Sequence, residues 1–546
     1  MTTPVSINFV DFVTPVPAIW LNYVNSFVNT TIPTQSVTSI AGLRTVSSVN
    51  VQYVFVAGYY APGDGGGGWY SFISTDHTST DNGGSIIVAS DGGRWYLQNS
   101  GRLSAKQFGA YADATHDDST ALQYIWSTGL HGYNMPAGQY KFNTAILNNY
   151  NTSSPSFPIP GVPSARADIA GDSLSNTILV YGGTGYAIVC QGSDNGGISQ
   201  GLLGLDVYRG FTLQNTTFSP AASSGITFVN KAWWKLEDVY IQYMGVALQL
   251  ESCFTSKVLK CIFGYSNIGV DMTATSLGAC NAISFDSCTF QNNTQMGVLG
   301  TNVGANNIFR DCTFESNGTQ GNLSTGGFVG NVSAFGSAGP ILFENCYFEE
   351  NAGIADISID NPTSSPLTIL IRGCSFTRAS NVFYTNNNIS VTSSGGGQVK
   401  VLLEGNQFIS AAPYVASNTR PFWNAGSSVV QFVDNGGNSW TETTSLPQPF
   451  YSGRAVAMVN FVGSTGVPTV SENLTVARAG VGGYNFTFVN PLLSANYGVQ
   501  VTGDAGGNGA VGYHISGQAT TGFSLTVTNQ TNVQFDPTTV AVTVYN

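Results

Sequence analysis

Two glutamates, Glu315 and Glu349, occupy the same position in two successive copies of a short repeated segment. The copies read FRDCTF at residues 309–314 and FENCYF at residues 343–348, and a glutamate follows each copy directly. Neighbouring strands of a sheet lie ~4.8 Å apart, and retaining glycoside hydrolysis needs two carboxyl groups ~5–5.5 Å apart. If the copies stack strand on strand, we expect one glutamate to act as the acid, kept protonated by its neighbour's charge, and the other as the nucleophile.

Other acidic and aromatic residues of the repeat extend this candidate site. Glu350, at a turn, and Asp271, on a third strand, are reserve carboxylates, because a sugar-binding groove can span two faces or two subunits. Asp271 and Asp356 are expected to point outward between apolar neighbours. Simpler interpretations compete, because outward acidic residues are often only solvated and one of two adjacent tryptophans often packs in the core. The candidates for contact with sugar rings are Tyr347, Tyr240, Trp233, Trp234 and Asp356.

Two other functions remain open beside hydrolysis, which we favour. Elimination would need a base such as Lys, His, Arg or Tyr beside a uronate. The central copies contain no histidine, which leaves Lys231, Lys235, Lys257 and Arg310 as candidates. An adhesin that binds sugar without cutting it is the third interpretation. No ligand pattern such as CxxC is present, so we expect no metal and no cofactor.

The repeat itself predicts the fold that would position these residues. With the cysteine as position zero, apolar residues occupy positions −5, −3, 0 and +2, and position −1 is mostly Gly, Asn or Asp. Positions −3 and 0 would face opposite sides of one straight strand, so the chain must bend at −1, where these residue types tolerate left-handed geometry. A third strand follows, and three strands per coil predict an all-β chain built on a right-handed parallel β-helix. Position zero holds Phe211, Val239, Cys261, Cys288, Cys312, Cys346, Cys374 and Asn406.

Several polar positions have structural interpretations. We expect the cysteines at position zero to be buried and reduced, because side chains of one column are nearly parallel and suit a disulfide poorly. The side chains at position −2 alternate in places between negative and positive charge, which predicts a ladder of ion pairs beside the bend. Asp117 and Asp118 are interpreted as the cap of a helix rather than as a catalytic pair. Position −2 holds Glu237, Asp286, Arg310, Glu344, Arg372 and Glu404.

Length and composition fit an elongated β chain. The 546 residues are too many for one compact domain, charged residues make up only 9%, and glycine contributes 65 residues. The net charge of −12 without a basic run argues against nucleic acid as a partner. No signal peptide and no run of ~18 apolar residues is visible, so we expect synthesis in a cytoplasm and no membrane insertion. The predicted parts are an attachment segment at 1–36, a small β-rich domain at 37–104, the β-helix at 105–447 and a β-sandwich at 448–546.

These features resemble phage tailspikes and capsule depolymerases. The segments FGA at 108–110, DD at 117–118 and PAGQY at 136–140 look like the pectate-lyase-type opening of the β-helix in that family. The segments GDGGG at 63–67 and DGGRW at 91–95 are similar to domains that precede such β-helices, and residues 450–546 resemble the sandwich ends of tail fibres. The Asn-Thr-Asp and Gly-His-Gly motifs of pectin hydrolases are absent, which disfavours a pectinase.

The resemblance carries expectations about function and assembly. It implies a virion protein made in the host cytoplasm, joined to the phage tail or baseplate through its N-terminus, and assembled as a parallel homotrimer. It also implies binding and cleavage of a bacterial surface polysaccharide, which would be a capsule, an exopolysaccharide or an O-antigen.

Overall fold

The computed structural model describes most of the chain. The chain divides into two compact units, Met1–Gln249 with Leu259–Ile262, and Leu250–Val258 with Phe263–Asn546. Strands β16 (Val246–Glu251), β17 (Phe254–Leu259) and β18 (Ile262–Gly264) lie where the units divide the sequence. The described residues are 34–49, 51–98, 101–127, 132–149, 168–191, 206–217, 222–276, 278–304, 306–332, 340–378, 385–410, 423–425, 429–440, 455–490, 492, 497–503, 512–529 and 531–545.

The first unit begins with a small sheet in the order β1-β2-β3-β5-β4. β1 and β2 run parallel, and the other neighbours run antiparallel. Side chains alternate along each strand, so one face buries Val54, Tyr70 and Trp95 with the short helix α2 (Ile40–Leu43). The strands are β1 (Thr34–Val37), β2 (Tyr53–Val56), β3 (Gly68–Phe72), β4 (Ile86–Val88) and β5 (Arg94–Gln98).

Parallel strands follow in the same unit. The 3₁₀ helix η1 (Ala105–Phe108) and helix α3 (Ser119–Ser127) come first, and α3 buries Leu122 and Trp126. The repeat register holds here, because Phe211 on β13 pairs with Val239 on β15. The strands are β6 (Leu103–Ser104), β7 (Tyr133–Met135), β8 (Gly138–Phe142), β9 (Ile146–Asn149), β10 (Asp168–Gly171), β11 (Thr177–Tyr181), β12 (Tyr186–Gln191), β13 (Asp206–Asn215), β14 (Ser224–Val229) and β15 (Trp234–Gln242).

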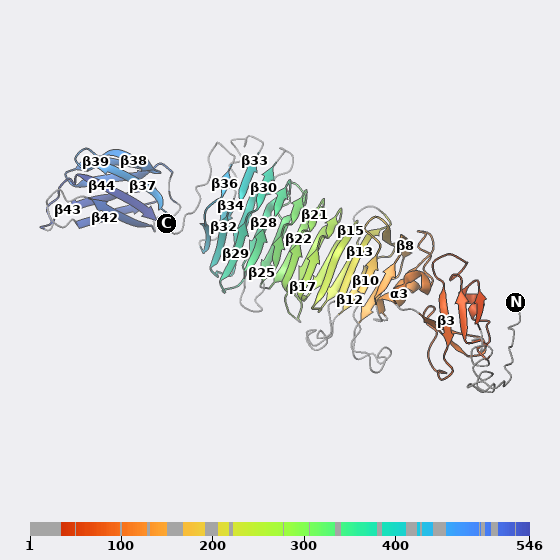
Figure 1. Cartoon of the computed structure of the whole chain (residues 1–546). Coiled ribbons are helices and arrows are strands. Elements are labelled where there is room, and N and C mark those ends of the chain that lie inside the picture. Colours follow the sequence, from red (N-terminus) through yellow and green to blue (C-terminus); the bar gives the residue numbers. More distant parts are fainter. Residues whose placement is uncertain are drawn as a thin grey trace, which may run out of the picture. The chain divides into compact units, whose positions relative to one another are not determined.

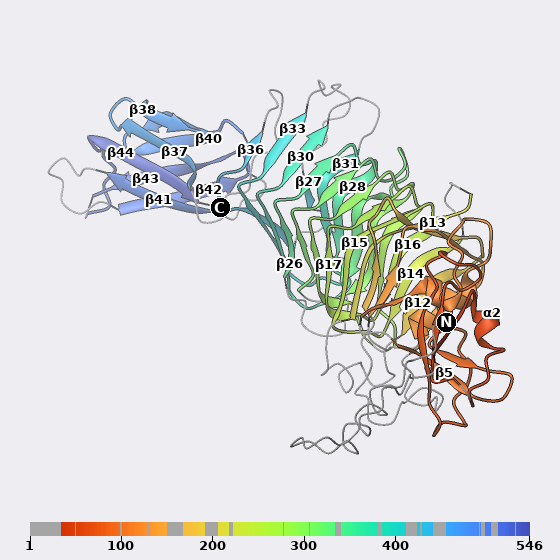
Figure 2. The ribbon, with the colours of Figure 1, turned by 45° about the vertical axis from the view of Figure 1, so that its right-hand side comes forward.

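The second unit continues as coils of three parallel strands, which we number as faces in chain order. Strands of one face lie side by side (Figure 1), and β26, β27 and β28 lie on different sides of one coil (Figure 2). The first face holds β20 (Asn281–Asp286), β23 (Ile308–Arg310), β26 (Ile341–Glu344), β29 (Leu367–Arg372), β32 (Val399–Glu404) and β35 (Val430–Asp434). The second face holds β21 (Thr289–Gln291), β24 (Thr313–Glu315), β27 (Tyr347–Glu349), β30 (Ser375–Arg378), β33 (Gln407–Ser410) and β36 (Ser439–Trp440). The third face holds β19 (Ile268–Thr273), β22 (Met296–Val303), β25 (Gly326–Val332), β28 (Gly353–Asp360), β31 (Thr385–Thr392) and β34 (Trp423–Ala425).

The bends between the first and second faces have the geometry that the sequence predicts. Asp311, Asn345 and Gly373, all at position −1, have φ of 53°, 52° and 63°. This left-handed conformation turns the chain sharply, so that positions −3 and 0 both point inward. The parallel β-helix expected from the repeat is therefore confirmed.

The interior is a set of stacked columns. Phe314 lies between Phe290 and Phe348, with ring centroids 4.6 Å and 4.8 Å away. All eight cysteines are free and buried, as expected for those at position zero. The thiols make weak hydrogen bonds to backbone carbonyls, such as Cys312 Sγ to Phe285 O at 3.3 Å.

A buried asparagine ladder (Asn293, Asn317 and Asn351) lies five residues after position zero. Asn293 Nδ2 donates to Asn317 Oδ1 at 2.8 Å, and Asn317 Nδ2 donates to Asn351 Oδ1 at 2.9 Å. Each amide also donates to a backbone carbonyl, as Asn317 does to Phe290 O at 2.8 Å. The ladder thus satisfies buried polar groups at the bend between the second and third faces.

The described residues from 455 onward form a β-sandwich. Two antiparallel sheets, in the orders β38-β37-β44-β41 and β39-β40-β43-β42, share one core that includes Phe486, Phe523 and Val542. The expected C-terminal sandwich is confirmed. The strands are β37 (Ala455–Val462), β38 (Val467–Glu472), β39 (Leu474–Gly480), β40 (Gly483–Phe488), β41 (Gly498–Gly503), β42 (Gly512–Ala519), β43 (Gly522–Thr528) and β44 (Thr539–Tyr545).

Candidate functional site

The second face of the β-helix brings Glu315 and Glu349 together. Glu315 ends β24, Glu349 ends β27, and the two residues are partners in the parallel pairing of these strands. Adjacent rungs lie ~4.8 Å apart, and both side chains point outward and are partly exposed. Gln291 and Thr377 continue the same column on either side. The two carboxylates therefore have the relative placement that the repeat predicts.

Tyr347 lies on the same outward face as Glu349, two residues earlier on β27. It is partly exposed, and burial together with the hydrogen bond to Glu349 raises the pKa of its phenol above the ordinary value. A phenol that stays protonated beside a carboxylate can donate to it and still present its ring to a ligand.

The interior below the pair fixes its position. Phe314 and Phe348 point inward directly before the glutamates and stack on each other. Ser316, with φ 54°, and Glu350, with φ 50°, turn the chain directly after them. Glu350 thus lies at the turn, as expected, and its amide donates to Thr377 O of the next coil at 3.4 Å.

Asp271 lies on a different face, on β19, where it pairs with Leu299 of β22. It points outward as expected, accepts from Thr273 Oγ1 at 2.7 Å, and has its pKa raised by burial. Glu251 also has its pKa raised, by burial and by the charge of Asp271. Sequence analysis missed Glu251, although it ends the third strand of its own copy and so belongs to the same face as Asp271.

The structure corrects the expectation for Asp356, which is buried with 4% of its surface exposed. The pairing of β25 with β28 joins Gly326 to Ala355 and Phe328 to Ile357, so Asp356 lies opposite Gly327. Gly327 belongs to a column with Gly269 and Gly297 that lies beside the asparagine ladder. Its carboxylate accepts from Asn351 Nδ2 at 3.0 Å and from Asn388 Nδ2 at 2.7 Å. Asp356 therefore extends the ladder and does not face a ligand.

Of the two adjacent tryptophans, one packs in the core and the other is partly exposed, as the simpler interpretation of the pair predicts. Trp234 is fully buried and stacks on Phe228 at 4.0 Å, so the expectation that it contacts sugar is wrong. Trp233 is partly exposed, with φ 54°. Tyr240, on β15 of the first unit, is partly exposed and pairs with Thr212. Trp233 and Tyr240 thus stay candidates for binding, in a different unit from the glutamates.

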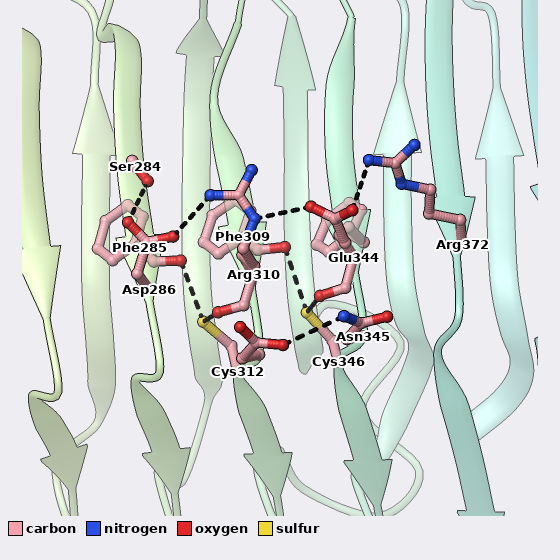
Figure 3. A network of polar contacts seen from close by, with 12 residues as sticks. Ser284, Phe285, Asp286, Phe309, Arg310, Cys312, Glu344, Asn345, Cys346 and Arg372 are labelled. Carbon is pink, nitrogen blue, oxygen red and sulfur yellow. Dashed lines mark hydrogen bonds and ion pairs between the residues drawn. The ribbon is translucent and has the colours of Figure 1, made fainter.

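The ladder at position −2 is present on the first face (Figure 3). Arg310 binds Asp286 on one side at 3.1 Å and Glu344 on the other at 2.7 Å, and Arg372 also binds Glu344. These pairs hold the pKa of Glu344 below its usual range. From Asp286 to Arg372 the charges compensate one another from strand to strand, which confirms the structural interpretation for this part of the column.

The candidate bases for elimination mostly have carboxylate partners. Lys231 binds Asp206 at 2.6 Å, Lys235 binds Glu237 at 2.7 Å, and Arg310 belongs to the ladder. Lys257 is exposed on β17. Within the described ranges there is no cluster of three or more His, Cys, Asp or Glu that could hold a metal ion.

The acidic residues before α3 have structural roles. Asp117 accepts from the backbone amide of Ser119 at 3.0 Å, at the first residue of the helix. Asp118 is buried and accepts from the amides of Tyr111 at 2.7 Å and Ala112 at 3.0 Å, and burial raises its pKa to about 6. The interpretation as capping holds for Asp117, whereas the carboxylate of Asp118 holds the preceding loop.

Comparisons with known proteins agree with this architecture. Residues 36–100 match the phage tail protein small four-stranded beta-sheet domain, and residues 173–332 match the right handed beta helix region. The Mu-like prophage FluMu defective tail fiber protein of Haemophilus influenzae is 24% identical over 351 residues, which are 60% of this chain and 50% of that protein. This chain thus matches only half the length of that curated relative.

Solved structures of phage tailspikes share the fold. The enzymatically active domain of bacteriophage CBA120 tailspike protein 2 has a TM-score of 0.54 at 14% identity, covering 97% of this chain and 83% of that one. The Acinetobacter phage vB_ApiP_P1 tailspike protein has a TM-score of 0.51 at 15% identity, covering 94% and 98%. Two segments of the chain therefore match a phage-tail β domain and a right-handed β-helix region, and the chain shares its fold with phage tailspikes. Among the residues that the structure describes, no helix has the length and apolarity needed to cross a membrane.

Proposed function

We propose that this chain is a virion tailspike that binds a bacterial surface polysaccharide and cleaves it by glycoside hydrolysis. The observation that carries the proposal is the pairing of Glu315 with Glu349 on one outward, polar face of the β-helix. The substrate would be a capsule, an exopolysaccharide or an O-antigen. A neutral or weakly charged chain fits the acidic protein better than a polyanion, because the net charge is −12.

The spacing of one rung fits a retaining mechanism. One carboxylate attacks the anomeric carbon while the other carboxyl group gives its proton to the departing glycosidic oxygen, so that one C–O bond forms as another breaks. The second group, now ionised, then takes a proton from water, whose oxygen displaces the enzyme carboxylate. Tyr347 beside the pair would stack on a sugar ring and keep the bond in line.

Glu251 and Asp271 on the third face are the alternative location for this chemistry. Their pKa values are raised by burial, and a raised carboxyl pKa is what a general acid requires. Glu350 has the lower rank because its backbone turns away from the glutamate column. Elimination and binding without cleavage remain the alternatives to hydrolysis.

Attachment and assembly complete the proposal. The phage-tail β domain at residues 36–100 supports attachment of the N-terminal part to the tail or baseplate. The attachment segment predicted at residues 1–36 lies almost wholly outside the described residues. We also propose a parallel homotrimer, with the domain boundaries near those that the sequence predicts.

The products identify the reaction. The full chain is incubated with purified bacterial capsules, exopolysaccharides and O-antigens, and each polysaccharide that it binds is followed by size-exclusion chromatography and proton NMR. Hydrolysis with retention predicts shorter chains whose new reducing ends first appear in the anomeric configuration of the substrate. New ends absorbing in the near ultraviolet as unsaturated uronates would show elimination, and a bound polysaccharide that stays full-length would show an adhesin.

A further inference from the structure

The first face of the β-helix carries an outward column of aliphatic side chains. Ile308 pairs with Leu342, Leu342 with Leu370, and Leu370 with Leu402. All are partly exposed, two residues before the ion-pair column. We call these residues the aliphatic column. On the next coil Val433 continues it and is already buried within the chain.

On the strands that the structure describes, the other two faces of the same coils do not carry such a column. Outward positions of the second face hold Thr313, Glu315, Tyr347 and Glu349, which form the candidate sugar site. On the third face, the column of Leu299 and Val329 changes to Ser358 and Ser390. An apolar column repeated over successive coils is therefore specific to the first face, and burying it would remove apolar surface from water.

The two flanks of the aliphatic column carry charges that could pair between copies. Lys400 and Glu404 lie on the same strand, β32, on opposite sides of Leu402 and ~13 Å apart along the strand. Both are exposed, and neither makes an ion pair with any residue that the structure describes. Arg372 is the neighbour of Glu404 on the adjacent rung, but its guanidinium binds Glu344.

We propose that the aliphatic column faces the three-fold axis of a parallel trimer, with second and third copies of this chain as its partners. Strands of a β-helix run across its axis, so parallel copies bring β32 to the same height. Cyclic symmetry then sets the Glu404 flank of one copy against the Lys400 flank of the next, and the pairing repeats around the ring. Elsewhere along this flank the ladder of Asp286, Arg310, Glu344 and Arg372 holds two carboxylates and two guanidinium groups, so it is neutralised within each chain and does not repel its neighbours.

This inference rests on the proposed homotrimer and deepens it by naming the contact face. The arrangement leaves the second face, with Glu315 and Glu349, outside the axis. It therefore assigns one face to assembly and the next face to the polysaccharide.

The first test places a charge in the column. Sedimentation velocity of the full chain with Leu370→Asp is expected to give one chain per particle at micromolar concentration, whereas the parent gives three. Leu323→Asp is the matched control, because Leu323 is 57% exposed but lies outside the column, and it should stay trimeric. Circular dichroism reports whether each variant keeps its β structure.

The second test reverses the flank charges and does not depend on a buried substitution. Lys400→Glu and Glu404→Lys should each lower the concentration of denaturant at which the trimer dissociates, and the double reversal should restore it. A trimer that resists Leu370→Asp, or a double variant as weak as the two single ones combined, would overturn the assignment of this face. A monomeric parent would instead overturn the proposed trimer itself, whereas loss of depolymerisation with an intact trimer would concern only the glutamate pair.

Discussion

Replacing Asn317 with alanine removes the middle rung of the asparagine ladder. Asn317 is fully buried, and its side chain accepts from Asn293 Nδ2 at 2.8 Å and from Asn293 N at 3.3 Å. It donates to Phe290 O at 2.8 Å and to Asn351 Oδ1 at 2.9 Å. At a net of about 1 kcal/mol for each of these contacts, the loss is about 4 kcal/mol per chain.

The assay is the rate of unfolding in denaturant, followed by tryptophan fluorescence, because elongated assemblies often unfold irreversibly. If the ladder is already broken in the transition state, about 4 kcal/mol corresponds to unfolding about 10³-fold faster. Gln407→Ala is the control, since it removes an exposed amide from the second face and should change stability by less than about 0.5 kcal/mol. An Asn317→Ala variant that unfolds within about fivefold of the parent would refute the reasoning that the ladder holds the coils in register.

Three further predictions concern other buried or charged groups. Burial raises the pKa of Asp118 to about 6, so the protonated carboxyl group contributes about 3 kcal/mol of stability at pH values below its ordinary pKa near 4, and this contribution is lost as the pH rises through about 6. Asp118→Asn should therefore remove this pH dependence from the melting temperature between pH 4 and 7, and an unchanged profile would contradict the assignment. The eight free, buried cysteines should resist a thiol reagent in native protein and react fully after unfolding, whereas rapid native labelling at position zero would show that the interior opens. Arg310→Met should lower the free energy of unfolding by about 1 kcal/mol or less, because the ladder is partly exposed to solvent, and the difference should shrink in 1 M salt. A decrease above about 3 kcal/mol would contradict this and make the ladder a major source of stability.

The fold was open to prediction because its signals are local and periodic. A sharp bend needs a residue that tolerates positive φ, and residue types such as those of Asp311 and Gly373 at position −1 therefore indicate the bend in the sequence. The thiols and phenylalanines on either side of the bend repeat with it. Register followed from this alignment, so the placement of Glu315 opposite Glu349 was also within reach of the sequence.

The third face was harder to predict, because its strands lack a bend residue that fixes their alignment. Asp356 and Asp271 look equivalent in sequence, since each stands among apolar residues. In the structure Asp271 aligns through Leu299 and Val329 with Ser358, whereas Asp356 lies two positions earlier. The carboxylate of Asp356 is satisfied by the amide of Asn351, at the preceding bend, and by that of Asn388 on β31. The part played by Asn388, 32 residues later in the chain, cannot be inferred from the segment around Asp356. A cluster such as Glu251 with Asp271 is likewise visible only once the strands are aligned.

The most direct test of the proposed function compares the parent chain with the Glu315→Gln, Glu349→Gln double variant on one polysaccharide that both bind. Asp311→Asn is the control, since it neutralises an exposed carboxylate at the adjacent bend and asparagine also tolerates the left-handed conformation there. With trimer formation checked first, the rate at which the polysaccharide shortens should fall at least about 10²-fold in the double variant and stay unchanged in the control, while binding persists. Equal rates of shortening by the parent and the double variant would contradict the account and move the site elsewhere, with Glu251 and Asp271 the next pair to replace.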